Sequence, residues 1–245
     1  MKFLNTLALT CIATSAIADT TLTYTSKKDK EVMKMQFSGN MMRATSVDDN
    51  SSFMIYDGNN KTFTMFANDE KKYYVLDEED IAKLSDMSAM IESMMEKQLA
   101  NVPEAQKEMM RNMMANAIKA QMPKELPKAV YSLTGKSSSY NGFDCQVVSK
   151  TSGKKKSEFC VTDYSNLGMS SNEYAIITSF QNTIAALAQK YGADNSMDFS
   201  SLGQFMPVKF SQEGESGTLT DVNHDTLDAS LFAVPEGYSE MEMPF

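Results

Sequence analysis

The chain has 245 residues, 23 basic and 32 acidic side chains, a formal net charge of −9, and 21 methionines but no tryptophan. An acidic surface repels nucleic acid, so we exclude a nucleic-acid partner. No glycine-rich phosphate loop occurs, and the carboxylates show no spacing typical of a reaction centre. We therefore expect a protein that is not an enzyme and holds no cofactor.

Residues 1–18 have the layout of a secretory signal peptide: Lys2, then an apolar run, then a small-x-small end at Ala16 and Ala18. We expect cleavage before Asp19, which leaves one domain over residues 19–245 in the bacterial periplasm. Cys11 is expected to be discarded with the peptide. No later apolar run approaches the ~20 residues of a membrane span, so no transmembrane segment is expected.

From Asp19 onward, apolar residues alternate with polar ones, which is typical of strands with one buried face. Turn residues such as Ser38-Gly39-Asn40 recur between these runs. The expected strands lie around residues 22–24, 33–37, 41–43, 53–56, 62–66 and 73–76. This spacing predicts an antiparallel meander.

The meander is interrupted at residues 77–122 by a segment with helical periodicity that carries nine of the 21 methionines. Pro103 and Glu104 mark the start of a second helix, so we predict a helical hairpin. The first helix has an apolar face that covers about half of its circumference, wider than the ~100° of a typical surface helix. We expect the methionine faces of both helices to line a ligand groove formed by Met87, Met90, Ile91, Met94, Met95, Met109, Met110, Met113 and Met114.

The methionines allow three interpretations. Flexible thioethers re-pack around varied apolar partners, which suits the acyl chain of a lipid or of a lipidated protein. Thioethers also bind Cu(I) and Ag(I), and Met87, Met90 and Met94 share one helix face. Ordinary core packing, in a structural or interaction protein without a small ligand, is the third interpretation.

Residues 143–163 predict a hairpin that contains both cysteines of the mature chain, Cys145 and Cys160. A hairpin centred on Ser152-Gly153 places the two cysteines directly opposite one another, within disulfide range. We expect the four-residue loop Thr151 to Lys154, because it gives a non-hydrogen-bonded pair whose side chains approach more closely. In an exported protein the two thiols should form a disulfide.

After the hairpin, residues 172–191 predict a core-facing helix with Ser170 or Ser171 as its N-cap. Strands are expected again at residues 208–212 and 218–222, followed by an extended run at 230–234. His224 lies in a turn with no partners at the spacing of a triad or a zinc site, so we expect it to be exposed. Lys154-Lys155-Lys156 could make transient contact with an anionic membrane, although we favour a solvated turn.

Several short motifs resemble a family of uncharacterised secreted bacterial domains, which is similar in turn to the LolA, LolB and LppX lipoprotein carriers. The motifs are Ile55-Tyr56-Asp57-Gly58, Tyr73-Tyr74-Val75-Leu76, Thr134-Gly135-Lys136, Asn141-Gly142-Phe143-Asp144-Cys145 and Leu231 to Tyr238. The resemblance implies a curved antiparallel half-barrel whose concave side holds acyl chains. Together with the periodicities, it predicts one α+β domain of about eight to ten strands, with the 77–122 hairpin and the 172–191 helix covering the concave face.

Overall fold

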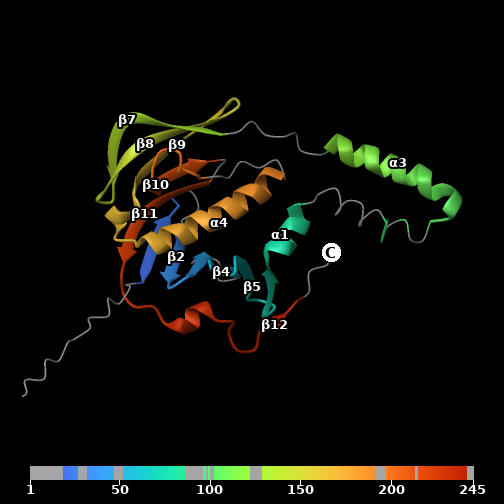
Figure 1. Cartoon of the computed structure of the whole chain (residues 1–245), viewed down its shortest axis with the longest axis horizontal. Helices are drawn as coiled ribbons and strands as arrows, with labels where there is room; N and C mark the ends of the chain where they lie inside the picture. Colours follow the sequence, from blue (N-terminus) through green and yellow to red (C-terminus); the bar gives the residue numbers. More distant parts are fainter. Residues whose placement is uncertain are drawn as a thin grey trace, which may run out of the picture.

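The computed structural model describes residues 19–26, 32–46, 52–85, 96, 97, 99, 102–121, 129–190, 197–212 and 215–241. These residues form one large, curved and unclosed sheet together with three α-helices, so the expected α+β class is confirmed (Figure 1). The signal peptide expected at residues 1–18 lies outside the described residues.

The sheet has 12 strands, more than the eight to ten that the sequence predicts. Two antiparallel meanders meet where β1 pairs with β11, and the order across the sheet is β12-β6-β5-β4-β3-β2-β1-β11-β10-β9-β8-β7. Among the described strands, only β12 pairs in parallel, with β6. The first meander contains β1 (Thr20–Thr25), β2 (Val32–Ser38), β3 (Met41–Ser46), β4 (Ser52–Asp57), β5 (Thr62–Ala67) and β6 (Lys72–Leu76). The second meander contains β7 (Val130–Tyr140), β8 (Phe143–Ser152), β9 (Lys155–Asp163), β10 (Phe205–Gln212) and β11 (Glu215–Asn223), and the short β12 (Ser239–Glu240) lies beside β6 at the edge of the first.

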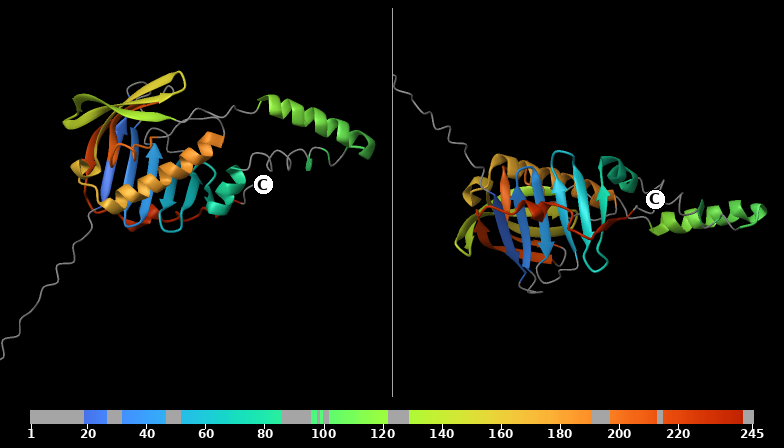
Figure 2. Two further views of the ribbon diagram at one scale, coloured as in Figure 1. Left: turned by 45° about the horizontal axis from the view of Figure 1, so that its top comes forward. Right: turned by 90° about the horizontal axis from the view of Figure 1, so that it is seen from below.

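The helix α4 (Ser171–Lys190) lies across the concave face of the first meander (Figures 1 and 2). It begins with a capping box, the reciprocal pattern in which two side chains bond the free amides of the first turn. The Ser170 amide donates to Glu173 Oε2 at 2.7 Å, and the Glu173 amide donates to Ser170 Oγ at 3.2 Å. The expected Ser170 cap is therefore confirmed.

Contacts along α4 hold it over one end of the strands. Near its start, Asn172 Nδ2 donates to the Gly39 carbonyl at 2.7 Å, in the β2–β3 turn. Further along, Ser179 Oγ lies 2.7 Å from the hydroxyl of Tyr56, and the Phe180 ring packs 5.8 Å from the Tyr56 ring. Beneath the helix a cross-strand row of side chains is buried: Phe37, Met42, Tyr56, Phe63 and Leu76.

The chain after β11 crosses the opposite, convex face (Figure 2, right). There the run at residues 230–234, expected to be extended, contains the 3-10 helix η2 (Ala229–Phe232) instead. Asp228 caps it by accepting a hydrogen bond from the Ser230 amide at 2.8 Å, a local bond that competes with an extended backbone. Phe232 is buried, and Tyr238 packs on Phe66 at the convex side of β5.

The 77–122 hairpin is only partly as expected. The helix α1 (Glu78–Ser85) packs on α4 and β6, and its Ile81 and Leu84 join the main core. The helix α3 (Glu104–Gln121) extends away from the sheet, so the prediction that it covers the concave face is wrong (Figures 1 and 2). Helical periodicity predicts that a segment is helical, but it does not predict what the apolar face of the helix packs against. In this structure α4 already lies on the concave face.

The disulfide Cys145–Cys160 is confirmed, with the two Cα atoms 5.3 Å apart. The expected register is wrong by two residues, because Cys160 pairs directly with Val147. The turn has two residues, Gly153 and Lys154, and Gly153 adopts the positive φ that the first position of a type II′ turn requires. The β8–β9 ladder ends at the pair Gln146–Val161, so the disulfide joins Cys160, which lies inside the ladder, diagonally to Cys145, one residue beyond its end.

Candidate functional site

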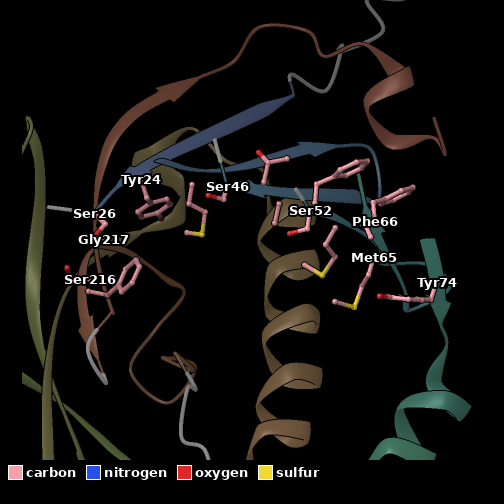
Figure 3. A pocket seen from close by; sticks show the side chains of 16 residues that line it. Tyr24, Ser26, Ser46, Ser52, Met65, Phe66, Tyr74, Ser216 and Gly217 are labelled. Carbon is pink, nitrogen blue, oxygen red and sulfur yellow. The ribbon is translucent and has the colours of Figure 1, made fainter. Parts of the chain in front are cut away.

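The part of the concave face that α4 leaves open forms a cavity of about 560 Å³. Its lining comes from strands and the residues directly at their ends, with no contribution from a described residue of α4. Figure 3 shows side chains of β1, β4, β5 and β6, including Tyr24, Ser52, Met65 and Tyr74, gathered around it. The lining residues are Tyr24, Ser26, Met33, Ala44, Thr45, Ser46, Ser52, Phe53, Met54, Met65, Phe66, Ala67, Tyr74, Phe210, Ser216 and Gly217.

The floor of the cavity is part of a cross-strand row in which each residue pairs with the next. Successive pairs run from β1 to β6, and period-two alternation turns all of these side chains to the concave face. The row consists of Leu22, Met35, Ala44, Met54, Met65 and Tyr74, and its last four members line the cavity. Two methionines of this row, Met54 and Met65, lie side by side on β4 and β5.

Burial decreases along the row from β1 to β5. Leu22 is fully buried, Met54 is partly buried, and Met65 is 42% exposed. The neighbouring row beneath α4 is buried throughout. Since both rows belong to the same strands, the difference comes from α4, which covers one row and not the other.

Aromatic side chains close the cavity on the side of β1 and β10. Tyr24 is 2% exposed, donates its hydroxyl to the Pro207 carbonyl at 2.9 Å, and lies 6.2 Å from the Phe210 ring. Burial raises the pKa of Tyr24 above its ordinary value of 10.0, so this wall is uncharged at neutral pH. The cavity is thus apolar inside, with thioethers and aromatic rings as its surface.

The groove residues expected from the sequence are not among those that line this cavity. Met109 and Met113 lie on α3 and are 62% and 66% exposed, and Met110 is exposed beside them. Met114 belongs to α3, but its side chain is not described. Met87, Met90, Ile91, Met94 and Met95 lie outside the described residues, and with them the Cu(I) hypothesis for Met87, Met90 and Met94.

Sequence reasoning assigned Met33, Met54 and Met65 to strands but not to a site. The available signal was their place at alternating positions, which puts each of them on the buried face of its strand. This alternation does not give the register between neighbouring strands, and it is the register that places Met54 next to Met65. It also lacks any indication that α4 stops short of this row.

Neither a cluster of metal ligands nor a membrane-spanning helix is found among the described residues. Across those residues, no group of three or more His, Cys, Asp or Glu side chains could hold a metal ion. His224 is exposed, as expected, with Nδ1 3.3 Å from Thr20 Oγ1. No described helix has the length and hydropathy to cross a bilayer.

A second, polar cleft of about 610 Å³ lies beside the disulfide. Its lining includes Ser137 to Ser139 on β7, Asp144 and Gln146 on β8, and Asp163 at the end of β9. Asp163 already accepts hydrogen bonds from the amide and the hydroxyl of Ser165, at 2.9 and 2.6 Å. Its carboxylate therefore caps the following 3-10 helix (Tyr164–Leu167), which is a structural role.

Comparison with known proteins gives a family but no activity. No curated protein matches the chain. Two solved structures of PNGF-II, in space groups C2 and P21, are 11% identical to it, with TM-scores of 0.42 and 0.40. They cover 92% and 91% of this chain, which spans only 31% of each PNGF-II chain. A family model described as "Domain of unknown function (DUF4412)" matches residues 77–238, about two thirds of the sequence, and the chain therefore belongs to that family.

Proposed function

We propose that the protein binds an apolar ligand without catalysis, and that the ligand, an acyl chain of a lipid or of a lipidated protein, occupies the concave cavity. The observation that carries this proposal is the open row of Met54 and Met65 at the floor of a cavity of about 560 Å³. Small-molecule sites typically have volumes of roughly 300–1,000 Å³ and mostly apolar walls.

The chemistry of the lining suits a flexible apolar chain. Transfer of a methylene group from water to an apolar site contributes about 0.8 kcal/mol. Methionine side chains are unbranched and polarizable, so Met33, Met54 and Met65 can re-pack around chains of different shape. A wall of β-branched residues, which are stiff at χ1, would adapt less.

The proposal also includes the expected periplasmic location and the resemblance to lipoprotein carriers. An export signal at residues 1–18 would deliver the domain to the periplasm, where lipids and lipoproteins cross between membranes. The LolA, LolB and LppX resemblance is part of the same proposal, since it implies a curved sheet that holds acyl chains on its concave side. The curved sheet and the helix on its concave face are compatible with it.

The test compares the cavity with the methionine face of α3. N-phenylnaphthylamine, an uncharged probe that fluoresces in apolar surroundings, is titrated into the purified protein and displaced with monolaurin. Met65→Lys should abolish binding, because a charge placed in an apolar wall without a partner is costly. Met113→Lys, on the exposed face of α3, is the matched control and should bind like the unmodified protein.

Two outcomes contradict the proposal. Loss of binding in Met113→Lys but not in Met65→Lys would move the site to the hairpin, as the sequence alone suggested. A protein that binds neither probe nor monolaurin, and carries no lipid when purified from its own compartment, would leave a structural or interaction role.

A further inference from the structure

The polar cleft beside the disulfide lies where two neighbouring strands separate. The β8–β9 ladder ends at the pair Gln146–Val161, and beyond it β8 continues beside β7 while β9 continues beside β10. Residues on both sides of this separation line the cleft, whose volume is about 610 Å³. Small-molecule sites typically have volumes of roughly 300–1,000 Å³, so the cleft has room for a ligand.

Strand pairing gathers the polar side chains of β7 and β8 on one face of the cleft. Ser137 pairs with Gln146, and Ser139 pairs with Asp144, two residues further along the same strands. Because alternate residues of a strand face the same side, these four side chains form one patch. All four are exposed, so a ligand can reach them.

A bulge in β7 sets where this patch lies along β8. The register between the two strands shifts just before Ser137, and Gly135 in the bulge has a φ of +75°, which favours glycine. Thr134 Oγ1 donates to the Val147 carbonyl at 3.0 Å and accepts from the Lys136 amide at 3.3 Å, which holds the irregular backbone in place. Such bulges are common beside functional sites, where they redirect side chains.

The opposite side of the cleft adds further hydrogen-bonding groups and an aromatic ring. Asp163 and Phe205 are direct cross-strand partners on β9 and β10. Asn166 Nδ2 donates to Thr162 Oγ1 at 3.0 Å, which orients the amide while its oxygen and second N–H can still bond a ligand. Asp163 Oδ1 accepts from Ser165, and the second oxygen of the same carboxylate can accept from a ligand.

We propose that the polar cleft binds a neutral saccharide, with its hydroxyl groups bonded to these carboxylates, amides and serines and one ring face packed on Phe205. Sugar hydroxyls both donate and accept, which matches a lining that combines carboxylate acceptors with amides and hydroxyls. Hydrogen bonds to a carboxylate are roughly twice as strong as neutral ones. Phe205 is partly exposed and supplies apolar surface for the C–H groups of a sugar ring. This inference goes beyond the proposed function and uses a different site.

The charge of the cleft favours a neutral ligand over an acidic one. Asp144 and Asp163 place two carboxylates on its walls, and the formal charge of −9 adds long-range repulsion. A metal ion is a poorer fit, because the described residues of the cleft provide no group of three or more His, Cys, Asp or Glu side chains that could hold one. A saccharide uses the hydroxyls and amides as well as the carboxylates.

Saturation-transfer difference NMR tests the inference with four neutral trisaccharides: maltotriose, cellotriose, mannotriose and triacetylchitotriose. At least one should give a signal, and the acidic trisaccharide trigalacturonate should give none, because the carboxylates repel it. If no neutral trisaccharide gives a signal, the inference is wrong. A signal from trigalacturonate as strong as that of the neutral compounds also contradicts it.

A tryptophan placed in the cleft locates the binding. Ser139→Trp fills the cleft from β7 and should abolish the signal. Ser132→Trp, at an exposed position of the same strand outside the cleft, is the matched control and should keep it. Tryptophan suits an exposed strand position, and circular dichroism checks that both variants are folded. Binding that survives in Ser139→Trp, or is lost in both folded variants, overturns the inference.

Substitutions of Asp144 separate a saccharide from a cationic ligand. Asp144→Ala removes an acceptor and should raise the Kd of the bound trisaccharide about tenfold, measured by titration calorimetry. Asp144→Asn keeps an acceptor oxygen and should raise it less, while Asp221→Ala, exposed on β11, should not change it. Equal losses in Asp144→Asn and Asp144→Ala, with spermidine bound by the unmodified protein, would show that charge holds the ligand and would overturn the inference. None of the substituted residues lines the concave cavity, so these outcomes are independent of the proposed function.

Discussion

Met54 on β4 and Met65 on β5 are direct cross-strand partners, and together they form the floor of the concave cavity. Directly opposed residues of an antiparallel pair have their Cβ atoms about 4.5–5.5 Å apart, so the two thioethers share one surface. Because α4 ends its contacts at the neighbouring row, this surface stays open, with Met65 42% exposed. The binding proposal depends on this pair.

Replacing both residues, Met54→Leu with Met65→Leu, should leave folding nearly intact. Exchanges between Met and Leu conserve volume and usually cost less than about 1.5 kcal/mol per site. The stiffer side chains should narrow the range of acyl lengths that bind, because leucine re-packs less freely than methionine. Denaturant unfolding measures the first effect and displacement by a series of monoacylglycerols the second. The control, Met109→Leu with Met113→Leu on exposed α3, should change neither.

Removal of the disulfide, with Cys145→Ala and Cys160→Ala together, should lower the free energy of unfolding by about 3 kcal/mol. The estimate follows from the closed loop, whose ends are separated by 15 residues. In the chain that begins at Asp19, thiol labelling of unfolded, unreduced protein should find no reactive thiol. Two reactive thiols per chain would contradict the bridge.

Ser170→Ala should destabilise the protein by about 1 kcal/mol, because it removes the hydroxyl that accepts from the Glu173 amide at 3.2 Å. The same substitution removes the 2.9 Å hydrogen bond from Ser170 Oγ to the carboxylate of Glu173, which is only 2% exposed. Ser171→Ala, at the next and exposed position, is the control and should cost little. Equal costs for the two variants would show that the capping box is not the source of the stability.

Tyr24→Phe should cost about 1–3 kcal/mol at neutral pH, since the buried Pro207 carbonyl loses its hydroxyl donor. Burial raises the pKa of Tyr24 above 10.0, so the folded protein keeps this phenol protonated where the unfolded chain ionises it. The contribution of Tyr24 to stability is therefore fully present below pH 10.0 and is lost as the pH rises above that value.

The stability difference between the unmodified protein and Tyr24→Phe should then shrink above pH 10.0, by up to roughly 1.4 kcal/mol per pH unit. Denaturant unfolding of both proteins from neutral to alkaline pH measures this, and the comparison cancels the effect of the other tyrosines. A difference that is constant across this range would mean that Tyr24 is not buried as a neutral phenol.

The sequence alone predicted most of the elements, because their signals are local. Alternation at Met33, Met35 and Phe37 marks a strand with one buried face, and Ser170 with Glu173 marks the start of a helix. The pairing of Cys145 with Cys160 also followed, since a tight hairpin brings only residues at similar distances from the turn together. These predictions needed nothing beyond the chemistry of neighbouring residues.

Only the tertiary structure decided where the open apolar surface lies. The hairpin methionines had the strongest pattern, yet Met113 on α3 points into solvent while Met65 on β5 lines the cavity. Strand register places Met54 beside Met65, and a two-residue shift moved Cys160 opposite Val147. Register depends on the turn type and loop length of each hairpin, and helix placement depends on contacts between residues far apart in the chain. Periodicity within one segment carries no information about either.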